Sequence, residues 1–298
     1  MNTRAAGLGL AFTTAVVSGV SIFLNGRAVH HFSDATVYTT AKNAVAGLLL
    51  VALAVAAPLH APRATRRRTP LRLLAVAVVG GSVPFVLFFE GLKRADATQA
   101  SFIQKTLVVW VALLAVPILR ERFGKPHALA IVLLVLGQAW LVGHAGTIAF
   151  GSGESMILGA TLLWAVEVVY VKHLLADLPP SLLAAARMGL GTVLLVAWVA
   201  ATGKTGQLTG LSAEQWKWIG LTGLLLAAYV ATWYAALARA QAVDVTAVLV
   251  FGAVVTALLS NATDGVSVDV TGTLLVTAGT AIVAYLVLQA PRRRAGTA

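Results

Sequence analysis

Two ionisable side chains interrupt long apolar stretches of this sequence: Glu167 within the run 156–175 and Lys105 within the run 96–119. An ionised side chain at the centre of a transmembrane helix costs at least about 2.5–3.5 kcal/mol, so it usually faces a partner or a water-filled path. An apolar setting disfavours the charged form of a carboxyl group, which lets Glu167 alternate between neutral and charged forms. Proton-coupled carriers require such a group. The alternative is a structural carboxyl, either protonated or paired with a base.

The two charges lie at similar expected depths. We therefore expect Lys105 and Glu167 to approach each other, with a substrate or a proton competing for the pair; a structural salt bridge is the alternative. Gln104 is the polar neighbour of Lys105. Lys42 and Arg187 lie six or seven residues inside their own runs, counted on the sequence. Each either snorkels to the nearer headgroups or belongs to a symmetric pair of gate or substrate contacts.

A second set of side chains is expected to line a cavity around these charges: Trp164, Tyr170, Asn25, Ser21, Tyr229 and Trp233. Trp164 and Tyr170 stand three residues to either side of Glu167, which places them near it on a helix. Ser21 and Asn25 belong to a polar stripe on the first run. Polar stripes of this kind either line a path or join helices by hydrogen bonds.

The elements that position these residues follow from composition. Of 298 residues, 59% are hydrophobic and 11% are charged, against roughly a quarter charged in soluble domains. This excludes an ordinary soluble fold and intrinsic disorder, and predicts an all-α polytopic membrane protein. Ten apolar runs are expected to span the bilayer: 6–26, 35–57, 72–91, 96–119, 127–145, 156–175, 181–202, 216–237, 243–261 and 270–289.

The net charge of +11 is explained better by topology than by nucleic acid. Most basic residues, including Arg66–Arg68 and Arg292–Arg294, fall in segments on one side of the expected spans. The positive-inside rule therefore predicts a multi-pass protein of the cell (inner) membrane with both termini cytoplasmic.

The two halves of the chain repeat at an offset of 145 residues, which places Lys42 on Arg187, Arg94 on Arg239 and Arg27 on Lys172. Five spans per half would insert the second copy upside down, as in many secondary transporters. We therefore expect two inverted five-helix repeats, 1–145 and 150–290, followed by a basic tail, 291–298. Chance similarity between apolar helices is the alternative.

Enzymatic motifs are absent from the sequence. It contains no P-loop and no HExxH pair, and no histidine lies in the middle of a span to serve a nucleophile. We expect no enzyme activity, no catalytic residues, no cofactor and no metal site. The expected partners are a small-molecule substrate, the lipid bilayer and, in a coupled carrier, protons, with no nucleic acid; the chain is expected to be a monomer or a homodimer.

The sequence resembles the EamA-type permeases of the drug/metabolite transporter superfamily over nearly its whole length. The resemblance rests on three stretches: Leu119-Arg120-Glu121-Arg122, Gly159…Trp164-Ala165…Tyr170-Val171-Lys172, and Ala186-Arg187. It implies a ten-helix carrier. This sequence departs from the pattern in two places. Many members have a proline near the middle of the fourth helix, where Lys105 lies nearby here, and the second half has only Asp264 as a near match to the Glu-Arg closure.

Glu167 also looks like the membrane-embedded glutamate of small multidrug resistance transporters, through a short stretch with Leu158, Gly159 and Val168. That likeness implies proton-coupled export of cationic or aromatic compounds as one option. The interpretation is a secondary transporter, with export favoured, of small metabolites, amino acids or drug-like compounds by alternating access. Proton coupling is a hypothesis, and facilitated diffusion would use the same scaffold. The alternative class is a non-transporting membrane protein, such as an assembly or sensor subunit.

Overall fold

The computed structural model describes residues 3–56, 69–95, 97–141 and 150–289. Within these ranges the regular elements are helices and no strand occurs. In the same ranges, nine helical segments are long and apolar enough to cross a membrane. The all-helical prediction is therefore confirmed for this part of the chain, and the basic tail expected at 291–298 lies outside it.

One expected span is shorter than the others. The run 127–145 corresponds to α7 (Lys125–Leu141), which has 17 residues. A helix perpendicular to the bilayer needs about 20 residues to cross it. The last expected residues of this span, 142–145, lie outside the described ranges.

The other helices follow in chain order. They are α1 (Thr3–Ala28), η1 (Val29–His31), α2 (Ala35–Ala56), α3 (Thr69–Val76), η2 (Ala77–Ser82), α4 (Val83–Leu92), α5 (Ala97–Lys105), α6 (Leu107–Leu119), α8 (Ser152–Leu174), α9 (Pro180–Ala185), η3 (Ala186–Leu190), α10 (Gly191–Ala201), α11 (Thr205–Thr209), α12 (Ala213–Leu237), α13 (Ala242–Leu249), α14 (Gly252–Asp264) and α15 (Val270–Gln289). The segments η2 and η3 are π-helical and lie inside longer helical rods.

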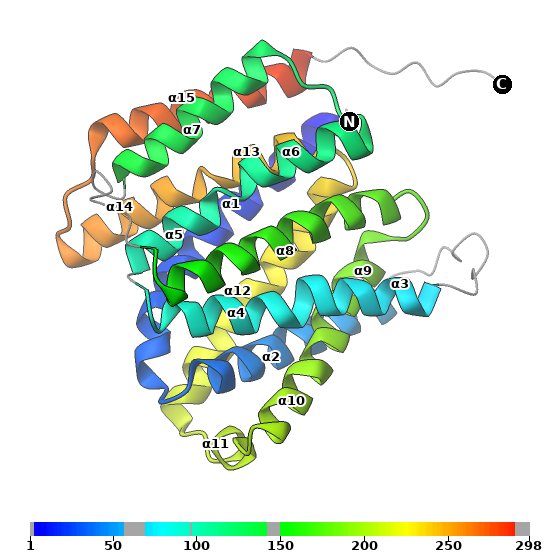
Figure 1. Cartoon of the computed structure of the whole chain (residues 1–298), viewed down its shortest axis with the longest axis vertical. Helices are drawn as coiled ribbons and strands as arrows, with labels where there is room; N and C mark the ends of the chain where they lie inside the picture. The colour runs from blue at the N-terminus through cyan, green and yellow to red at the C-terminus, as the bar shows by residue number, and fades with distance from the viewer. Residues whose placement is uncertain (1–2, 57–68, 96, 142–149, 290–298) are drawn as a thin grey trace.

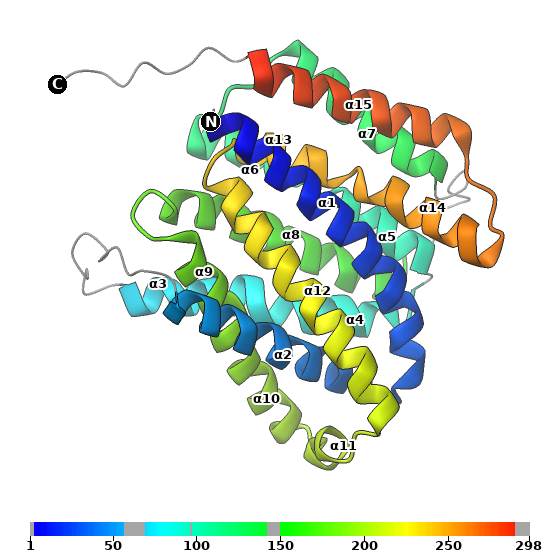
Figure 2. The same cartoon turned by 180° about the vertical axis from the view of Figure 1, so that it is seen from behind.

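The first helix of each half packs against helices of the other half. α1 packs on α12, and α8 packs on α4. α1 also contacts α13 and α14, while α8 contacts α5 and α6. α7 and α15 lie side by side along one edge of the molecule (Figures 1 and 2). Each of these contacts therefore has a counterpart made by elements of the other half.

The molecule has two ends along its helices. We call the end where α1 begins and α15 ends the terminal face (Figure 1). The turn between α12 and α13 lies there too, because Gly7 of α1 packs against Arg239 and Ala240. We call the opposite end, where α1 and α4 finish and α5 begins, the distal face.

Two rods are broken at corresponding positions. α5 ends at Lys105 before α6, and α13 ends at Leu249 before α14. Val250, at the second break, lies 145 residues after Lys105. The first break is held by Thr106, whose hydroxyl donates to the carbonyl of Ile103 at 2.6 Å. Discontinuous helices of this kind commonly build the binding sites of transporters.

The π-helical segments touch each other through glycine. A Cβ atom on Gly81 would lie 1.9 Å from the carbonyl oxygen of Arg187, and one on Gly191 would lie 2.7 Å from the carbonyl oxygen of Gly81. Only glycine permits this approach of two backbones. Gly81 therefore serves the close packing of two backbones.

On the distal face, Asp34 caps the start of α2. Its Oδ1 accepts the backbone N–H groups of Thr36 at 2.8 Å and Val37 at 3.1 Å, and Lys204 forms an ion pair with its Oδ2 at 2.7 Å. Partial burial acts to raise the pKa of Asp34, but the bonds from Lys204 and Val37 outweigh it and lower the pKa below the ordinary value. This cap ties the loop after α10 to the start of α2.

Candidate functional site

A cavity of about 230 Å³ lies among α1, α2, α4, α5, α6, α8, η3, α12 and α13. Ten of the eleven candidate side chains line it: Glu167, Lys105, Gln104, Arg187, Lys42, Trp164, Asn25, Ser21, Tyr229 and Trp233. Tyr170 does not, although it follows Glu167 by one helical turn. Trp164 and Tyr170 are six residues apart, which rotates them by about 240° around the helix, so they do not share one face. The sequence therefore located a real cavity through its polar and aromatic residues.

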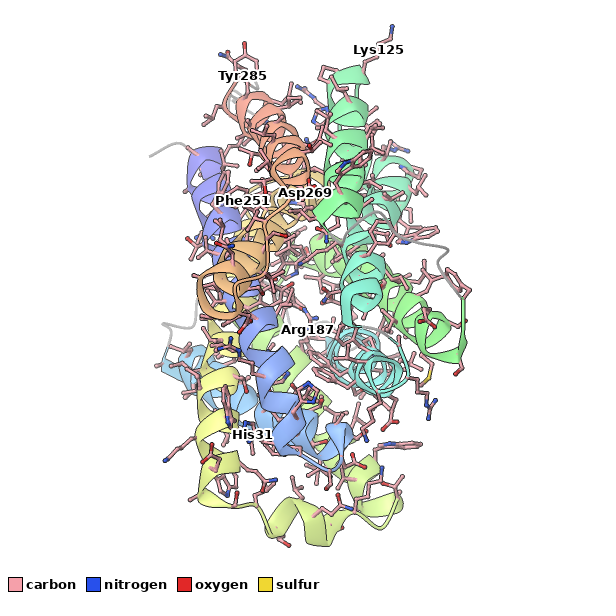
Figure 3. The ribbon with its side chains drawn as sticks, turned by 90° about the vertical axis from the view of Figure 1, so that its left-hand side faces the viewer. His31, Lys125, Arg187, Phe251, Asp269 and Tyr285 are labelled. Carbon is pink, nitrogen blue, oxygen red and sulfur yellow. The ribbon has the colours of Figure 1, made fainter. Side chains whose placement is uncertain are left out.

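Glu167, which lines this cavity, is held by Arg187 and Tyr234. Its Oε2 lies 3.7 Å from the guanidinium Nη1 of Arg187, and its Oε1 accepts the hydroxyl of Tyr234. Glu167 and Arg187 are both buried, and Figure 3 places Arg187 inside the arrangement of helices. The expected pairing of Glu167 with Lys105 is wrong, because the described side chains contain an Arg187–Glu167 ion pair instead.

The backbone of η2 explains why Arg187 reaches this position. The Gly80 carbonyl accepts hydrogen bonds from Arg187 Nε and Trp164 Nε1, each at 3.2 Å. A Cβ atom on Gly80 would lie 2.6 Å from Cγ of Glu167. The absent side chain therefore makes room for the carboxylate, and the carbonyl orients the guanidinium. Local departures from α-helical bonding such as η2 are frequent at functional sites.

Lys42 is also enclosed. Its Nζ donates to Asn25 Oδ1 at 2.8 Å and lies 4.4 Å from the ring centroid of Phe89 and 4.9 Å from that of Tyr38. Asn25 is itself oriented by a bond from its Nδ2 to the carbonyl of Ser21 at 2.6 Å. Contacts to aromatic faces stabilise a desolvated cation. The snorkelling alternatives for Lys42 and Arg187 are therefore wrong, because both side chains are buried and point into protein.

Lys105 differs from the other cations of the cavity. It is 6% exposed, and no described side chain or carbonyl forms a hydrogen bond or an ion pair with its Nζ. It also borders a second, much smaller void together with Gln138, whose Oε1 has no hydrogen-bond partner among the described residues. Among the described cations of the cavity, Lys105 is therefore the one available for a ligand.

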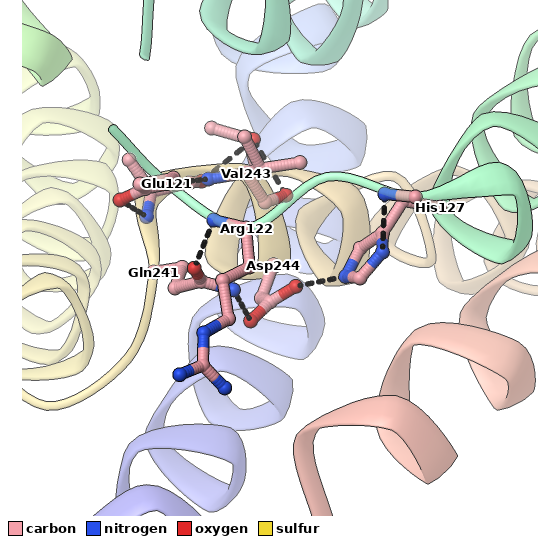
Figure 4. Close-up of polar contacts among 9 residues, drawn as sticks. Glu121, Arg122, His127, Gln241, Val243 and Asp244 are labelled. Carbon is pink, nitrogen blue, oxygen red and sulfur yellow. Dashed lines mark hydrogen bonds and ion pairs between the residues drawn. The ribbon is translucent and has the colours of Figure 1, made fainter. Parts of the chain in front are cut away.

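A polar cluster joins two loops on the terminal face (Figure 4). Glu121 accepts the backbone N–H groups of Ala242 at 2.6 Å and Val243 at 3.0 Å, so it caps the start of α13. Arg122 N donates to Gln241 Oε1 at 2.8 Å. This cluster joins two loops more than 100 residues apart in the chain.

Two further contacts lie beside this polar cluster on the terminal face. His127 Nε2 lies 3.5 Å from Asp244 Oδ1, and Lys172 Nζ donates to the carbonyls of Leu237 and Ala240 at 2.6 Å each. Burial raises the pKa of Glu121, although its two backbone bonds favour the charged form. In the sequence, Glu121 stood out only as part of a span-end motif. The signal that would have found its role is the polar start of α13, with Gln241 and Asp244.

The cavity extends toward the distal face. Its lining on α1 runs from Ser18 to Gly26, in the second half of that helix, and its lining on α4 runs from Phe85 to Leu92, the last residue. Toward the terminal face, the lining on α13 begins at Thr246. This residue lies four positions after Ala242, the first residue whose N–H group Glu121 caps. The lining therefore reaches the distal ends of α1 and α4 and stops short of the capped start of α13.

Comparisons with known proteins agree on one family. The model of the EamA-like transporter family matches residues 5–143 and 151–288. A protein named "Uncharacterized transporter" from Methanothermobacter thermautotrophicus is 31% identical over 114 residues, which cover 37% of this chain and 33% of that one. Another of the same name from Archaeoglobus fulgidus is 28% identical over 180 residues, covering 59% and 61%. The matches thus span less than two thirds of either relative.

A solved structure titled "Crystal structure of protein" shares the fold, with a TM-score of 0.77 at 15% identity over 94% of this chain and 98% of that one. At that identity, the likeness concerns the fold alone. The family match covers almost the entire sequence in two consecutive halves. This chain therefore belongs to the EamA-like transporter family and is a multi-pass membrane protein.

Proposed function

We propose that this protein is a secondary transporter that exports a small metabolite across the cell membrane by alternating access. The observation that carries the proposal is the cavity, which reaches the distal ends of α1 and α4 and stops short of the capped start of α13, with the buried Glu167–Arg187 pair in its lining. A carrier needs a site that is open to one side and closed to the other. A bundle with a purely structural role has little need for such a cavity.

We propose that this mechanism uses two inverted repeats, 1–145 and 150–290, with ten membrane-spanning helices, of which α7 is the shortest. The exchanged helix contacts support this arrangement. So do the helix breaks at Lys105 and Val250, and the two cation–aromatic contacts at the same offset, Lys42 over Phe89 and Arg187 over Tyr234. Related halves can exchange their conformations, which is how inverted repeats open alternate sides.

The distribution of basic residues supports a cytoplasmic position for the terminal face. In that orientation, the cavity opens outward and the Glu121 cluster is the closed cytoplasmic gate. The hypothesis is that Glu167 provides the coupling step. A proton on its carboxyl group removes the negative charge that holds Arg187, and loss of that proton restores the ion pair. Substrate and proton would thus compete for one site.

The test uses purified protein in liposomes that contain a pH-sensitive dye, with a panel of amino acids and organic acids. Wild type is expected to give substrate-dependent proton flux, and Glu167→Gln is expected to abolish it. The matched control is Glu214→Gln, an exposed carboxyl at the start of α12. Solute movement without proton flux would leave a facilitator. Absence of any solute movement would contradict the proposal and favour a non-transporting membrane protein.

The gate supplies a separate prediction. Glu121→Ala removes a charged acceptor from two backbone N–H groups, and each hydrogen bond to a charged group contributes about 1.5–3 kcal/mol. Opening of the terminal face is therefore expected to become at least about tenfold more frequent. The chain has no cysteine, so Thr246→Cys gives a single reporter in the cavity, labelled by a membrane-impermeant maleimide added on the terminal side.

The labelling rate of Thr246→Cys is expected to rise at least about tenfold when Glu121→Ala is added. Glu214→Ala serves as the control and is expected to leave the rate unchanged, because Glu214 lies at the distal end of α12. Equal labelling rates with and without Glu121→Ala would remove Glu121 from the gate.

A further inference from the structure

The ionisable side chains that line the cavity do not balance in charge. Among the described residues of the lining, the charged side chains are one acid, Glu167, and three bases, Arg187, Lys42 and Lys105. The acid is already paired, because Arg187 lies 3.7 Å from one carboxylate oxygen, which accepts no hydrogen bond from a described residue, and Tyr234 donates to the other. The lining therefore offers a ligand an excess of positive charge and no free carboxylate.

The two lysines are in different situations. Lys42 has an amide oxygen at 2.8 Å and two aromatic rings around its ammonium group. Among the described residues, nothing forms a hydrogen bond or an ion pair with Lys105, although this residue is only 6% exposed. A buried ammonium without a partner is costly, so an anion that enters the cavity gains most by binding at Lys105.

The remainder of the lining is apolar and aromatic. Trp164 lies between Phe85 and Phe88, with ring centroids 5.6 Å and 5.5 Å away, and Tyr229 and Trp233 form a stacked pair at 6.0 Å. Aromatic walls of this kind accept a planar apolar body. The volume of about 230 Å³ is below the roughly 300–1,000 Å³ of pockets for drug-sized ligands. The ligand is therefore a small metabolite.

We propose that the cavity selects a small organic anion, an apolar or aromatic monocarboxylate, whose carboxylate pairs with Lys105 while its apolar body contacts the aromatic wall around Trp164. This inference rests on the proposed function, in which the cavity is the transport site. It disfavours a cationic solute, the option implied by the likeness to small multidrug resistance transporters. Such a solute would meet three bases and an acid that is already paired.

Three probes of matched shape test the charge preference: 3-phenylpropionate, its neutral amide and 3-phenylpropylamine. Calorimetric titration of the purified full chain in nanodiscs is expected to give binding of the carboxylate at least about tenfold tighter than of the amide, with the amine weakest. Equal affinities, tightest binding of the amine, or no binding of any probe would overturn the proposal.

The variant Lys105→Met keeps an unbranched side chain of similar length and removes the charge. It is expected to lower the affinity for 3-phenylpropionate to that for the amide and to leave the amide unchanged. Lys217→Met, on the exposed start of α12, is the control and is expected to behave as wild type. A thermal unfolding midpoint near that of wild type verifies that Lys105→Met is folded. Unchanged carboxylate affinity in Lys105→Met would overturn the assignment of the ligand carboxylate to Lys105.

The two proposals fail in different ways. Lys105-dependent binding of the carboxylate without any flux in liposomes would remove the transport function and keep the anion site. Flux of neutral or cationic solutes that Lys105→Met leaves unchanged would keep the transport function and remove the anion site.

Discussion

Replacing Arg187 with methionine is expected to destabilise the folded protein by about 3–5 kcal/mol, because it leaves the carboxylate of Glu167 buried without its partner. The two side chains are 6% and 1% exposed, and their closest charged atoms are 3.7 Å apart. Methionine has a similar length and preserves most of the packing. The loss is measured as the shift of the unfolding transition in mixed detergent micelles.

The double variant Glu167→Met with Arg187→Met separates charge from packing. Exchange of a whole buried ion pair for apolar side chains is often neutral or stabilising. The double variant is therefore expected to regain most of the stability that Arg187→Met loses, while proton-coupled flux stays absent. If the double variant is as unstable as Arg187→Met alone, the destabilisation comes from lost packing and hydrogen bonding around Gly80 rather than from an unpaired charge.

Hydrophobicity was sufficient to predict the membrane class and, within the described residues, nine helical segments long and apolar enough to span the bilayer, because the cost of burying polar backbone in lipid forces helices of nearly fixed length. The same logic predicted which charged side chains lie in the interior of the protein. A charge in an apolar run must face the interior, and Glu167, Lys105, Arg187 and Lys42 all line one cavity. Residue type and depth were therefore good guides to where these side chains lie.

Residue type and depth did not determine pairing. Depth estimates assume regular helices, but Lys105 lies at a break between α5 and α6, and Arg187 lies in the π-helical η3. Each irregularity rotates and shifts a side chain relative to an ideal helix. The partner of Glu167 was decided by the contact between η2 and η3, which depends on two glycines meeting across the halves. No local pattern carries that information.

The role of Glu121 was missed for a related reason. Its carboxylate sits at the end of a span, where a solvated charge is the ordinary outcome. Its function depends on the backbone N–H groups of Ala242 and Val243, which lie about 120 residues later in the chain. Capping of a helix by a distant side chain leaves no spacing rule in the sequence.

Adding one methyl group at Gly81 is expected to destabilise the protein by about 3 kcal/mol or more, at the upper end of the usual cost of overpacking. The new Cβ atom of Gly81→Ala would lie 1.9 Å from the carbonyl oxygen of Arg187 and 2.9 Å from its carbonyl carbon. Both are backbone atoms within η3, so neither moves as the tip of a side chain does. Separation of η2 from η3 also displaces the Arg187 guanidinium, so substrate-dependent flux is expected to fall in any protein that still folds.

Gly220→Ala is the matched control, because it places the same methyl group in a membrane-spanning helix where no atom lies within 4 Å of the new Cβ. Alanine is favoured over glycine in a helix interior by up to about 1 kcal/mol. The control is therefore expected to unfold at or above the wild-type midpoint, while Gly81→Ala unfolds well below it. Equal midpoints for the two variants would mean that η2 and η3 do not meet at Gly81. The route by which Arg187 reaches Glu167, and with it the ion pair that lines the cavity, would then need a different explanation.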